Sequence, residues 1–345
     1  MRKLVIIFTI ILVVCFFNLM HKNSANSFPK IVLKGKVITN LVEGEEYKEP
    51  GYKAVDDNDG DITDKVKIEG TVNYTKEGIY ELSYSVKNSK NEKAKVLRFV
   101  KVNKKEEVVY KDEYDKIDNT SRGWWSGNNF DFKRPSGGAD INELKKYNAY
   151  FLGKDEKVIY LTFDEGSLET YLDKIVDVLN ENNVKATFFL CKKYIEQNPD
   201  LIKKMVKSGH SVGNHTFHHK NMPSLATREN FNEYLSEIKD TEEAFYNITN
   251  KEIDKVYRDP RGEWSYRDLS IMKDLGYKTY FYSANYDDFS KTLSMDEALS
   301  EMMKRYHNGA IYLIHPNNKG NYEALDSFIK EMKKLKYRFD LVKNI

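Results

Sequence analysis

The sequence contains only two cysteines, Cys15 and Cys191, in 345 residues. Cys15 lies inside an apolar run near the N-terminus, so a disulfide to Cys191 is implausible and the chain is not held together by disulfide bonds. The sequence also lacks an excess of charge, with a formal net charge of +2, and it has no basic stripe or nucleic-acid recognition motif. We therefore expect no nucleic-acid partner, whereas the oligomeric state stays open.

The N-terminus has the pattern of an export signal. Arg2 and Lys3 precede an apolar run at residues 4–20. Its length is near the lower limit for crossing a bilayer, which is about 17 residues, and no Ala-x-Ala cleavage pattern follows it. We predict an uncleaved signal anchor at residues 1–22 that places the protein in the cell membrane, with the folded domains outside the cell. A cleaved signal peptide and a lipoprotein modified at Cys15 are the alternatives.

Residues 30–103 have the pattern of an all-β domain. Short runs of alternating apolar and polar residues at 65–68, 79–86 and 96–102 are separated by turn residues, which is typical of a β-sandwich. The aspartate-rich segment 57–63 resembles the immunoglobulin-like modules of bacterial surface proteins. A turn is favoured there over a calcium site, because the spacing of the acids does not match a calcium-binding loop.

A second domain is predicted at residues 124–345, after a charged linker at 104–123. It begins with Trp124 and Trp125, in a stretch rich in glycine, asparagine and serine. Exposed aromatic side chains can stack on sugar rings, but packing against the main domain is favoured.

From residue 158 onward, strand-like apolar runs alternate with amphipathic helical runs. Alternating strands and helices predict an α/β fold with a parallel sheet covered by helices, and seven strands suit a distorted (β/α)7 barrel. The predicted strands are 158–163, 186–190, 211–213, 255–257, 278–283, 310–314 and 337–342. In such barrels the active site forms at the C-terminal ends of the strands.

Five short polar motifs lie at the ends of these predicted strands. They are Thr162-Phe163-Asp164-Glu165-Gly166, His215-Thr216-Phe217-His218-His219, Arg258-Asp259-Pro260-Arg261-Gly262, Asn285-Tyr286-Asp287-Asp288-Phe289 and Leu313-Ile314-His315. His215 and His219 are four residues apart, so on a helical turn both imidazoles could bind one metal ion; His218 is the rival ligand. Two adjacent carboxylates, a histidine pair, an arginine and a late histidine suit a metal-dependent hydrolase.

In kind and order, the motifs resemble those of the polysaccharide deacetylases (the NodB-homology fold, carbohydrate esterase family four). The resemblance implies a divalent metal ion, which we expect to be zinc, and a set of catalytic residues. The implied metal ligands are Glu165, His215 and His219, and the implied catalytic residues are Asp164 as general base, Arg258 orienting it, His315 as general acid and Asp288 as its partner. Glu165 stands where the family usually has aspartate, so its longer side chain must swing to reach the ion.

The resemblance also implies which residues bind the substrate. Pro260 and Gly262 shape a loop in which the backbone N–H of Arg261 faces the developing oxyanion. Leu313 and Phe289 are the other expected substrate-binding residues, and Phe289 replaces a tryptophan in the wall around the acetyl group.

Within the family, the chain is similar to the muramic-δ-lactam de-N-acetylases of the spore cortex. The guanidinium of Arg261 suits a carboxylate, and N-acetylmuramic acid carries a lactyl carboxylate once its peptide is removed. We therefore predict a hydrolase that removes acetyl groups from N-acetylmuramic acid in the glycan strands of peptidoglycan. The alternatives are an N-acetylglucosamine deacetylase of the vegetative wall that confers lysozyme resistance, and a non-catalytic glycan-binding protein.

Overall fold

The computed structural model describes residues 28–104, 108–127, 131–165 and 170–345. The chain divides into two compact units, with the boundary between Val108 and Val109. The predicted anchor at residues 1–22 lies outside the described residues. The predicted membrane location is corrected, because none of the helices in the described ranges is long and apolar enough to cross a bilayer.

The smaller unit is a β-sandwich, as predicted. One sheet has the strand order β1-β3-β4 and the other has the order β2-β7-β6-β5, and β2 runs parallel to β7. Apolar side chains fill the space between the sheets, among them Ala54, Tyr84 and Val100. The strands are β1 (Lys30–Leu33), β2 (Ile38–Val42), β3 (Tyr52–Asp56), β4 (Gly60–Asp61), β5 (Lys67–Glu69), β6 (Gly78–Lys87) and β7 (Lys93–Asn103).

The aspartate-rich segment of this unit forms a hydrogen-bonded turn. Oδ1 of Asp56 accepts from the backbone N–H groups of Asn58 and Asp59 at 2.9 and 3.1 Å. Oδ1 of Asp61 accepts from the backbone N–H of Thr63 at 3.0 Å. These acids are used to shape the backbone, which is the role that the turn interpretation gives them.

The larger unit is built on a curled parallel sheet. Its strand order is β16-β10-β11-β12-β13-β15-β9, and β17 also pairs with β10. Every pairing between these strands is parallel. The strands are β9 (Ala149–Tyr150), β10 (Val158–Glu165), β11 (Thr187–Leu190), β12 (Ser211–Asn214), β13 (Val256–Tyr257), β15 (Lys278–Tyr280), β16 (Ala310–Ile314) and β17 (Arg338–Phe339); β8 (Arg122–Gly123) and β14 (Glu263–Trp264) form a separate pair.

The sheet curls so that its two ends approach each other. Leu152, just after β9, and Ala284, just after β15, make isolated bridges to Ala310 and Tyr312 of β16. The predicted α/β fold with a parallel sheet is confirmed, but the sheet is a curled half-barrel rather than a complete seven-stranded ring. Strand β9 was not predicted, because two residues are too few to show a period.

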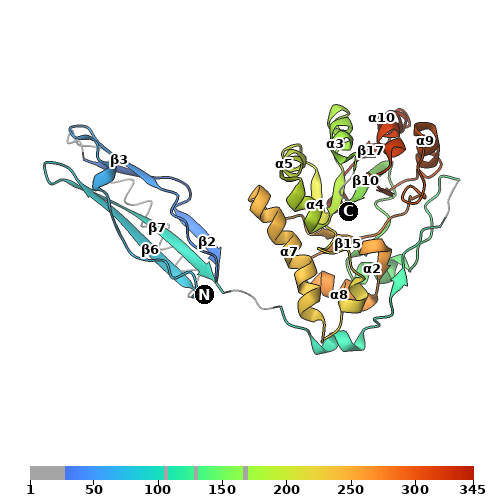
Figure 1. Cartoon of the computed structure of the whole chain (residues 1–345), viewed down its shortest axis with the longest axis horizontal. Helices are drawn as coiled ribbons and strands as arrows, with labels where there is room; N and C mark the ends of the chain where they lie inside the picture. The colour runs from blue at the N-terminus through green and yellow to red at the C-terminus, as the bar shows by residue number, and fades with distance from the viewer. Residues whose placement is uncertain (1–27, 105–107, 128–130, 166–169) are drawn as a thin grey trace. The chain divides into compact units, whose positions relative to one another are not determined.

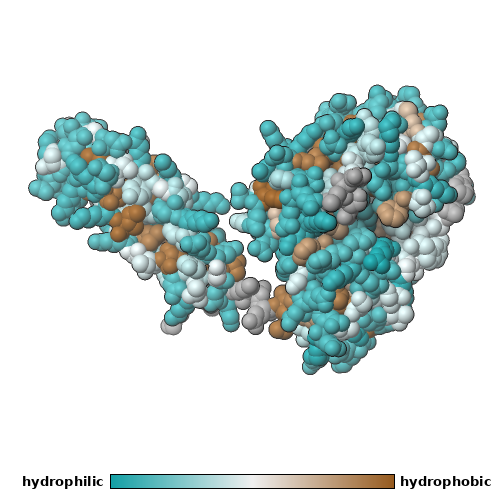
Figure 2. Space-filling model, viewed as in Figure 1, coloured by the Kyte–Doolittle hydropathy of each residue, from teal (hydrophilic) through white to brown (hydrophobic). Residues whose placement is uncertain are grey.

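Helices cover the outside of this sheet (Figure 1). They are α2 (Ile141–Lys146), α3 (Leu172–Glu181), α4 (Lys192–Gln197), α5 (Pro199–Lys207), α6 (Met222–Leu225), α7 (Phe231–Thr249), α8 (Tyr266–Asp274), α9 (Met295–Met303) and α10 (Lys319–Lys334). The amphipathic pattern expected of these helices is seen in α3, which buries Leu172, Ile175, Val176 and Leu179. Such burial stabilises the fold by about 1.5–3 kcal/mol for each large apolar side chain. The outer face in view is mostly hydrophilic (Figure 2).

The larger unit begins earlier in the chain than predicted. Tyr114, in the short 3-10 helix Asp112–Lys116, is buried in a cluster with Phe231 and Tyr234. The ammonium of Lys111 also forms an ion pair with Asp274 at 2.6 Å. Residues from Val109 onward therefore pack on this unit, and the linker predicted at 104–123 includes a structured segment.

The close approach of β12 to β13 gives a test of the fold. A Cβ atom on Gly213 would lie 2.6 Å from Cγ2 and 2.7 Å from the backbone oxygen of Val256. Gly213→Ala should therefore push the strands apart and lower the free energy of unfolding by about 1–3 kcal/mol. Urea unfolding followed by tryptophan fluorescence measures this, since the three tryptophans all lie in the larger unit.

Gly123→Ala is the matched control for this experiment. A Cβ atom on Gly123 meets nothing within 4 Å, so the free energy of unfolding should change by less than about 0.5 kcal/mol. Equal effects of the two substitutions would contradict the tight strand contact.

Candidate active site

The predicted motifs converge on one pocket of about 800 Å³ at the C-terminal edge of the curled sheet. Parallel strands end on the same edge, so side chains from separate motifs meet there. The pocket is lined by Asp164, Glu165, His215, His219, Arg258, Arg261, Gly262, Tyr282, Asn285, Tyr286, Asp287, Asp288, Phe289, Arg305, Leu313, His315, Pro316 and Asn317. Pro260 is buried and is not part of the lining.

Asp164 and Arg258 form a buried ion pair at the base of the pocket. Nη1 of Arg258 donates to Oδ1 of Asp164 at 2.7 Å and to Oγ1 of Thr162 at 2.7 Å. Nε and Nη2 of Arg258 donate to the backbone oxygens of Tyr280 and Phe281 at 2.7 and 3.2 Å. A buried charge needs this many partners to offset its desolvation. The carboxylate of Asp164 is thereby held in one direction.

His215 and His219 face each other beside this carboxylate. Nδ1 of His215 donates to the backbone oxygen of Arg258 at 2.9 Å, which leaves Nε2 without a proton and 4.0 Å from Oδ2 of Asp164. The ring centroids of the two histidines are 4.9 Å apart. Burial lowers the pKa of His215 and lowers that of His219 to about 4. Both rings are therefore neutral near pH 7, the form in which imidazole binds a metal.

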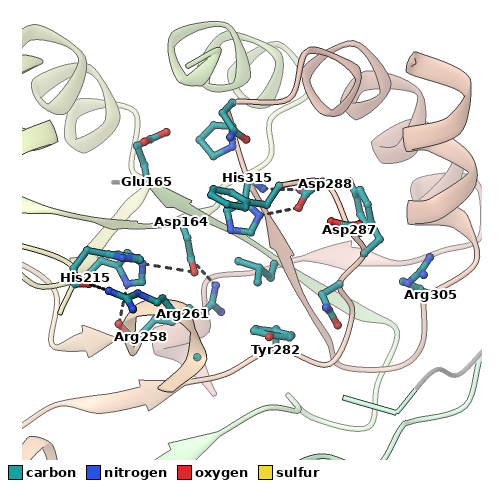
Figure 3. Close-up of a pocket in the computed structure, with 18 residues that line it drawn as sticks. Asp164, Glu165, His215, Arg258, Arg261, Tyr282, Asp287, Asp288, Arg305 and His315 are labelled. Atoms are coloured by element: carbon teal, nitrogen blue, oxygen red, sulfur yellow. Dashed lines mark hydrogen bonds and ion pairs between the residues drawn. The ribbon is translucent and has the colours of Figure 1, made fainter. Parts of the chain in front are cut away.

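Glu165 does not join the two histidines in this arrangement. Figure 3 shows Asp164 directed toward His215, whereas Glu165 points away from it. The described ranges contain no group of three or more acidic, cysteine or histidine side chains placed to hold a metal ion. Two neutral imidazoles beside a carboxylate are nonetheless a donor set that suits zinc.

His218 lies outside the pocket lining. Its Nδ1 is 2.7 Å from Oε1 of the buried Glu237, and its side chain is 53% exposed. The same carboxylate accepts from the backbone N–H groups of Phe217 and His218. His218 thus helps to shape the turn that carries the two facing histidines.

Across the pocket, His315 is paired with Asp288. Nδ1 of His315 is 2.7 Å from Oδ1 of Asp288, and Oδ2 of Asp288 accepts from the backbone N–H of His315 at 2.8 Å. Asn321 also donates to Oδ2 at 2.6 Å. Burial works against a charged His315, but the hydrogen bond and charge of Asp288 outweigh it and raise the pKa of His315. With Nδ1 engaged, Nε2 is the nitrogen left to meet a ligand.

The other predicted substrate-binding residues lie around the pocket mouth. Arg261 has a φ angle of +57°, its side chain is 59% exposed, and Nη2 donates to the backbone oxygen of His219 over a long 3.4 Å. Phe289 is 71% exposed, with its ring centroid 5.3 Å from that of His315. Leu313 is buried in the wall. The exposed guanidinium of Arg261 offers a ligand a polar contact, and the exposed ring of Phe289 offers it an apolar contact.

A buried carboxyl pair behind the pocket was not predicted. The Oδ2 atoms of Asp259 and Asp268 are both buried, and neither has a hydrogen-bond partner in the described ranges. The hydroxyls of Tyr257 and Tyr234 donate to their Oδ1 atoms at 2.9 and 2.6 Å. Burial, followed by the neighbouring carboxyl, raises the pKa of Asp259.

Burial also raises the pKa of Asp268, to about 6. Asp268 lies in the first turn of α8, where the helix dipole favours its charged form, so Asp259 is the carboxyl group that keeps its proton to the higher pH. No spacing rule connects these two acids, so the sequence offered no signal for the pair.

Comparisons with known proteins agree with this architecture. The profile of the family described as "Polysaccharide deacetylase" matches residues 152–280, and that of "Bacterial surface protein, Ig-like domain" matches residues 31–102. Peptidoglycan-N-acetylmuramic acid deacetylase PdaA of Bacillus subtilis is 38% identical over 227 residues, which cover 63% of this chain and 85% of that protein. A peptidoglycan-N-acetylglucosamine deacetylase of Bacillus cereus is 31% identical over 201 residues, covering 57% and 71%.

Solved structures show the same likeness. The structure of Bacillus subtilis PdaA, a family 4 carbohydrate esterase, has a TM-score of 0.62 at 36% identity and covers 66% of this chain and 97% of that chain. A family 4 carbohydrate esterase from Bacillus anthracis has a TM-score of 0.54 at 31% identity, with the same coverage of 66% and 97%.

The raised pKa of Asp259 predicts a pH-dependent stability. The folded-state pKa of Asp259 lies above its ordinary value of 3.8. Protonated Asp259 therefore makes its full contribution to the free energy of unfolding below pH 3.8, and this contribution is lost as the pH rises through the folded-state pKa. Asp259→Asn keeps the shape of the side chain but cannot ionise. The free energy of unfolding of this variant, relative to wild type, should therefore rise with pH by up to about 1.4 kcal/mol per pH unit.

Urea unfolding between pH 4 and 9, followed by tryptophan fluorescence, measures this difference. Asp173→Asn, at an exposed position of α3, is the control and should follow wild type at every pH. A constant difference between wild type and Asp259→Asn across the range would rule out a raised pKa at Asp259.

Proposed function

This chain belongs to the polysaccharide deacetylase family, and on that premise we propose that it removes the acetyl group of N-acetylmuramic acid in peptidoglycan glycan strands. Members of the family hydrolyse N-acetyl amide bonds, so the chain is a hydrolase. The proposal is carried by one observation. The ion-paired Asp164 and the Asp288-supported His315 line the same pocket, as amide hydrolysis requires of a base and an acid.

Asp164 is the general base in this proposal. It takes a proton from the water that attacks the acetamide carbonyl carbon. Arg258 fixes the direction of this carboxylate through the contact at 2.7 Å. A positioned base of this kind contributes about 10²–10⁴-fold to the rate.

His215 and His219 are the proposed ligands of a divalent metal ion, which we take to be zinc, with Glu165 as third ligand after rotation of its side chain. When bound, such an ion supplies Lewis-acid polarisation of the acetamide carbonyl. The neutral state of both imidazoles and the engaged Nδ1 of His215 suit this role.

His315 is the proposed general acid. Nε2 gives its proton to the amide nitrogen as the C–N bond breaks, so the products are acetate and a free amino sugar. The backbone N–H of Arg261, in the loop shaped by Pro260 and Gly262, is the proposed donor to the oxyanion. Phe289 and Leu313 are the proposed apolar contacts of the acetyl methyl group.

Arg261 is the proposed determinant of the sugar. Its guanidinium is largely exposed at the pocket mouth, and its contacts within the described residues are long, at 3.4 Å to the backbone of His219 and 4.0 Å to Glu263. A planar guanidinium binds a carboxylate through two parallel hydrogen bonds. The lactyl carboxylate distinguishes N-acetylmuramic acid from N-acetylglucosamine and is free only after the stem peptide is removed.

The metal proposal is tested by elemental analysis of the purified protein after dialysis against zinc. Wild type should hold one equivalent, and His219→Ala should lose it, because two-coordinate binding by His215 and one carboxylate is weak. Glu165→Gln should retain less zinc than wild type. His218→Ala is the matched control and should keep the full equivalent. Stoichiometric zinc in His219→Ala would exclude this ligand set.

The acid role of His315 is tested by the pH dependence of kcat. The pKa of His315 is raised above 6.5, so the acid form persists and activity should fall only above that pH. Asp288→Asn removes the carboxylate charge that offsets the effect of burial on the pKa of His315. The loss of activity should therefore occur at a pH that is lower by about 1–3 units. Asp287→Asn, the partly exposed neighbour, is the control. If the alkaline side of the kcat profile has the same midpoint in Asp288→Asn as in wild type, a group other than His315 causes the loss of activity.

The sugar is tested with three substrates, namely peptidoglycan stripped of peptides by an amidase, intact peptidoglycan and N-acetylglucosamine oligomers. Wild type should prefer the stripped glycan. Arg261→Gln should lose about ten- to a hundredfold in kcat/KM on it, the value of a charged hydrogen-bonded contact of roughly 1.5–3 kcal/mol. Activity on the oligomers should not change. A wild-type preference for the oligomers would favour an N-acetylglucosamine deacetylase, and the absence of acetate release from all three would favour a glycan-binding protein.

A further inference from the structure

The segment formed by Trp124, Trp125 and Ser126 runs along one edge of the pocket. The backbone N–H of Trp124 donates to the backbone oxygen of Gly262 at 2.7 Å. The hydroxyl of Ser126 donates to Oδ1 of Asn285 at 2.8 Å. Gly262 and Asn285 both line the pocket, so Trp125 is held between two points of attachment to the pocket wall.

Trp124 anchors this segment in the core. Its ring stacks on Phe281 with centroids 4.2 Å apart and an angle of 10°. Its indole Nε1 donates at 2.9 Å to the backbone oxygen of Tyr282, a residue at the lower edge of the pocket in Figure 3. Only 6% of Trp124 is exposed, whereas 54% of Trp125 is exposed. The two neighbours therefore have opposite environments, as expected for extended backbone.

The exposed ring of Trp125 rests on a glycine. A Cβ atom on Gly138 would lie 3.4 Å from Cδ1 and Nε1 of Trp125 and 3.4 Å from the ring of Trp124. An isolated antiparallel β-bridge between Ser126 and Gly137 holds the backbone next to Gly138 beside the tryptophan segment. The backbone at Gly138 therefore lies close to the indole, so the ring is supported while more than half of the residue stays open.

We propose that Trp125 is a stacking platform for a second sugar of the glycan strand, next to the sugar whose acetyl group is in the pocket. A pyranose ring has an apolar C–H face that packs on an aromatic ring, and the indole N–H can donate to a sugar oxygen. The cost of leaving a large apolar ring in water is offset when such a ligand covers it. This inference rests on the proposed polymeric substrate, since a single sugar in the pocket would not need the platform.

Tryptophan fluorescence gives a direct test of binding. The chain has three tryptophans, and Trp124 and Trp264 are buried at 6% and 0% exposure, so acrylamide quenching reports mainly on Trp125. A peptide-free peptidoglycan tetrasaccharide should protect wild type from acrylamide. The monosaccharide N-acetylmuramic acid should not. Trp125→Phe should show low quenching with or without the tetrasaccharide. Quenching of wild type that the tetrasaccharide leaves unchanged would overturn the platform.

Kinetics provide the second readout. Trp125→Ala should raise KM for the tetrasaccharide about tenfold, the effect of losing one aromatic contact of roughly 1.4 kcal/mol, and leave the monosaccharide unchanged. Trp125→Phe keeps an aromatic ring, so its KM for the tetrasaccharide should stay close to that of wild type. Tyr246→Ala is the matched control, because Tyr246 is a 45% exposed aromatic residue of α7, a helix that contributes no residue to the pocket lining.

The two readouts separate this inference from the proposed function. An equal loss in Trp125→Ala on both sugars would indicate a general structural effect and overturn the platform. Protection of Trp125 by the tetrasaccharide without acetate release would support the platform and contradict the proposed hydrolysis. Acetate release without protection of Trp125 would support the proposed hydrolysis and contradict the platform.

Discussion

The buried guanidinium of Arg258 is the contact on which the pocket depends. Two of its nitrogens donate to backbone oxygens at the end of β15, and a third reaches Asp164 on β10. Its own backbone oxygen fixes the ring of His215, which follows β12. A charge this far from water is tolerated only when its donors are matched. The curl of the sheet satisfies that condition, because it brings β10, β12 and β15 around one side chain.

The electrostatics of the pocket differ between its two sides. On one side, burial lowers the pKa of His215 and His219, so their rings are neutral and can bind a cation. On the other side, Asp288 raises the pKa of His315, so this ring keeps a proton that it can donate. The same amino acid is thus placed in two protonation states by its surroundings. Neighbouring groups with pKa values moved in opposite directions are typical of acid–base sites.

Much of this arrangement could be predicted from the amino-acid sequence, and the failures have a common cause. The rule that parallel strands end on one edge was enough to assign the five motifs to one site. The charged composition of 104–123 concealed Tyr114, whose burial depends on α7 and α8 far along the chain. The buried acids Asp259 and Asp268 were missed for the same reason, since their burial depends on packing and follows no spacing along the chain. Contacts between distant elements are decided by packing rather than by local pattern.

The α/β class, the order of the motifs and the residue types at each strand end could be read from the sequence, because periodicity and turn chemistry are local properties. The direction in which each of two adjacent side chains points depends on the fold. Asp164 is directed toward His215 while Glu165 points away, and Trp124 is buried while Trp125 is exposed. Neighbours in extended backbone point to opposite sides, and the packing of the whole sheet, not the identity of either residue, determines which side becomes the pocket.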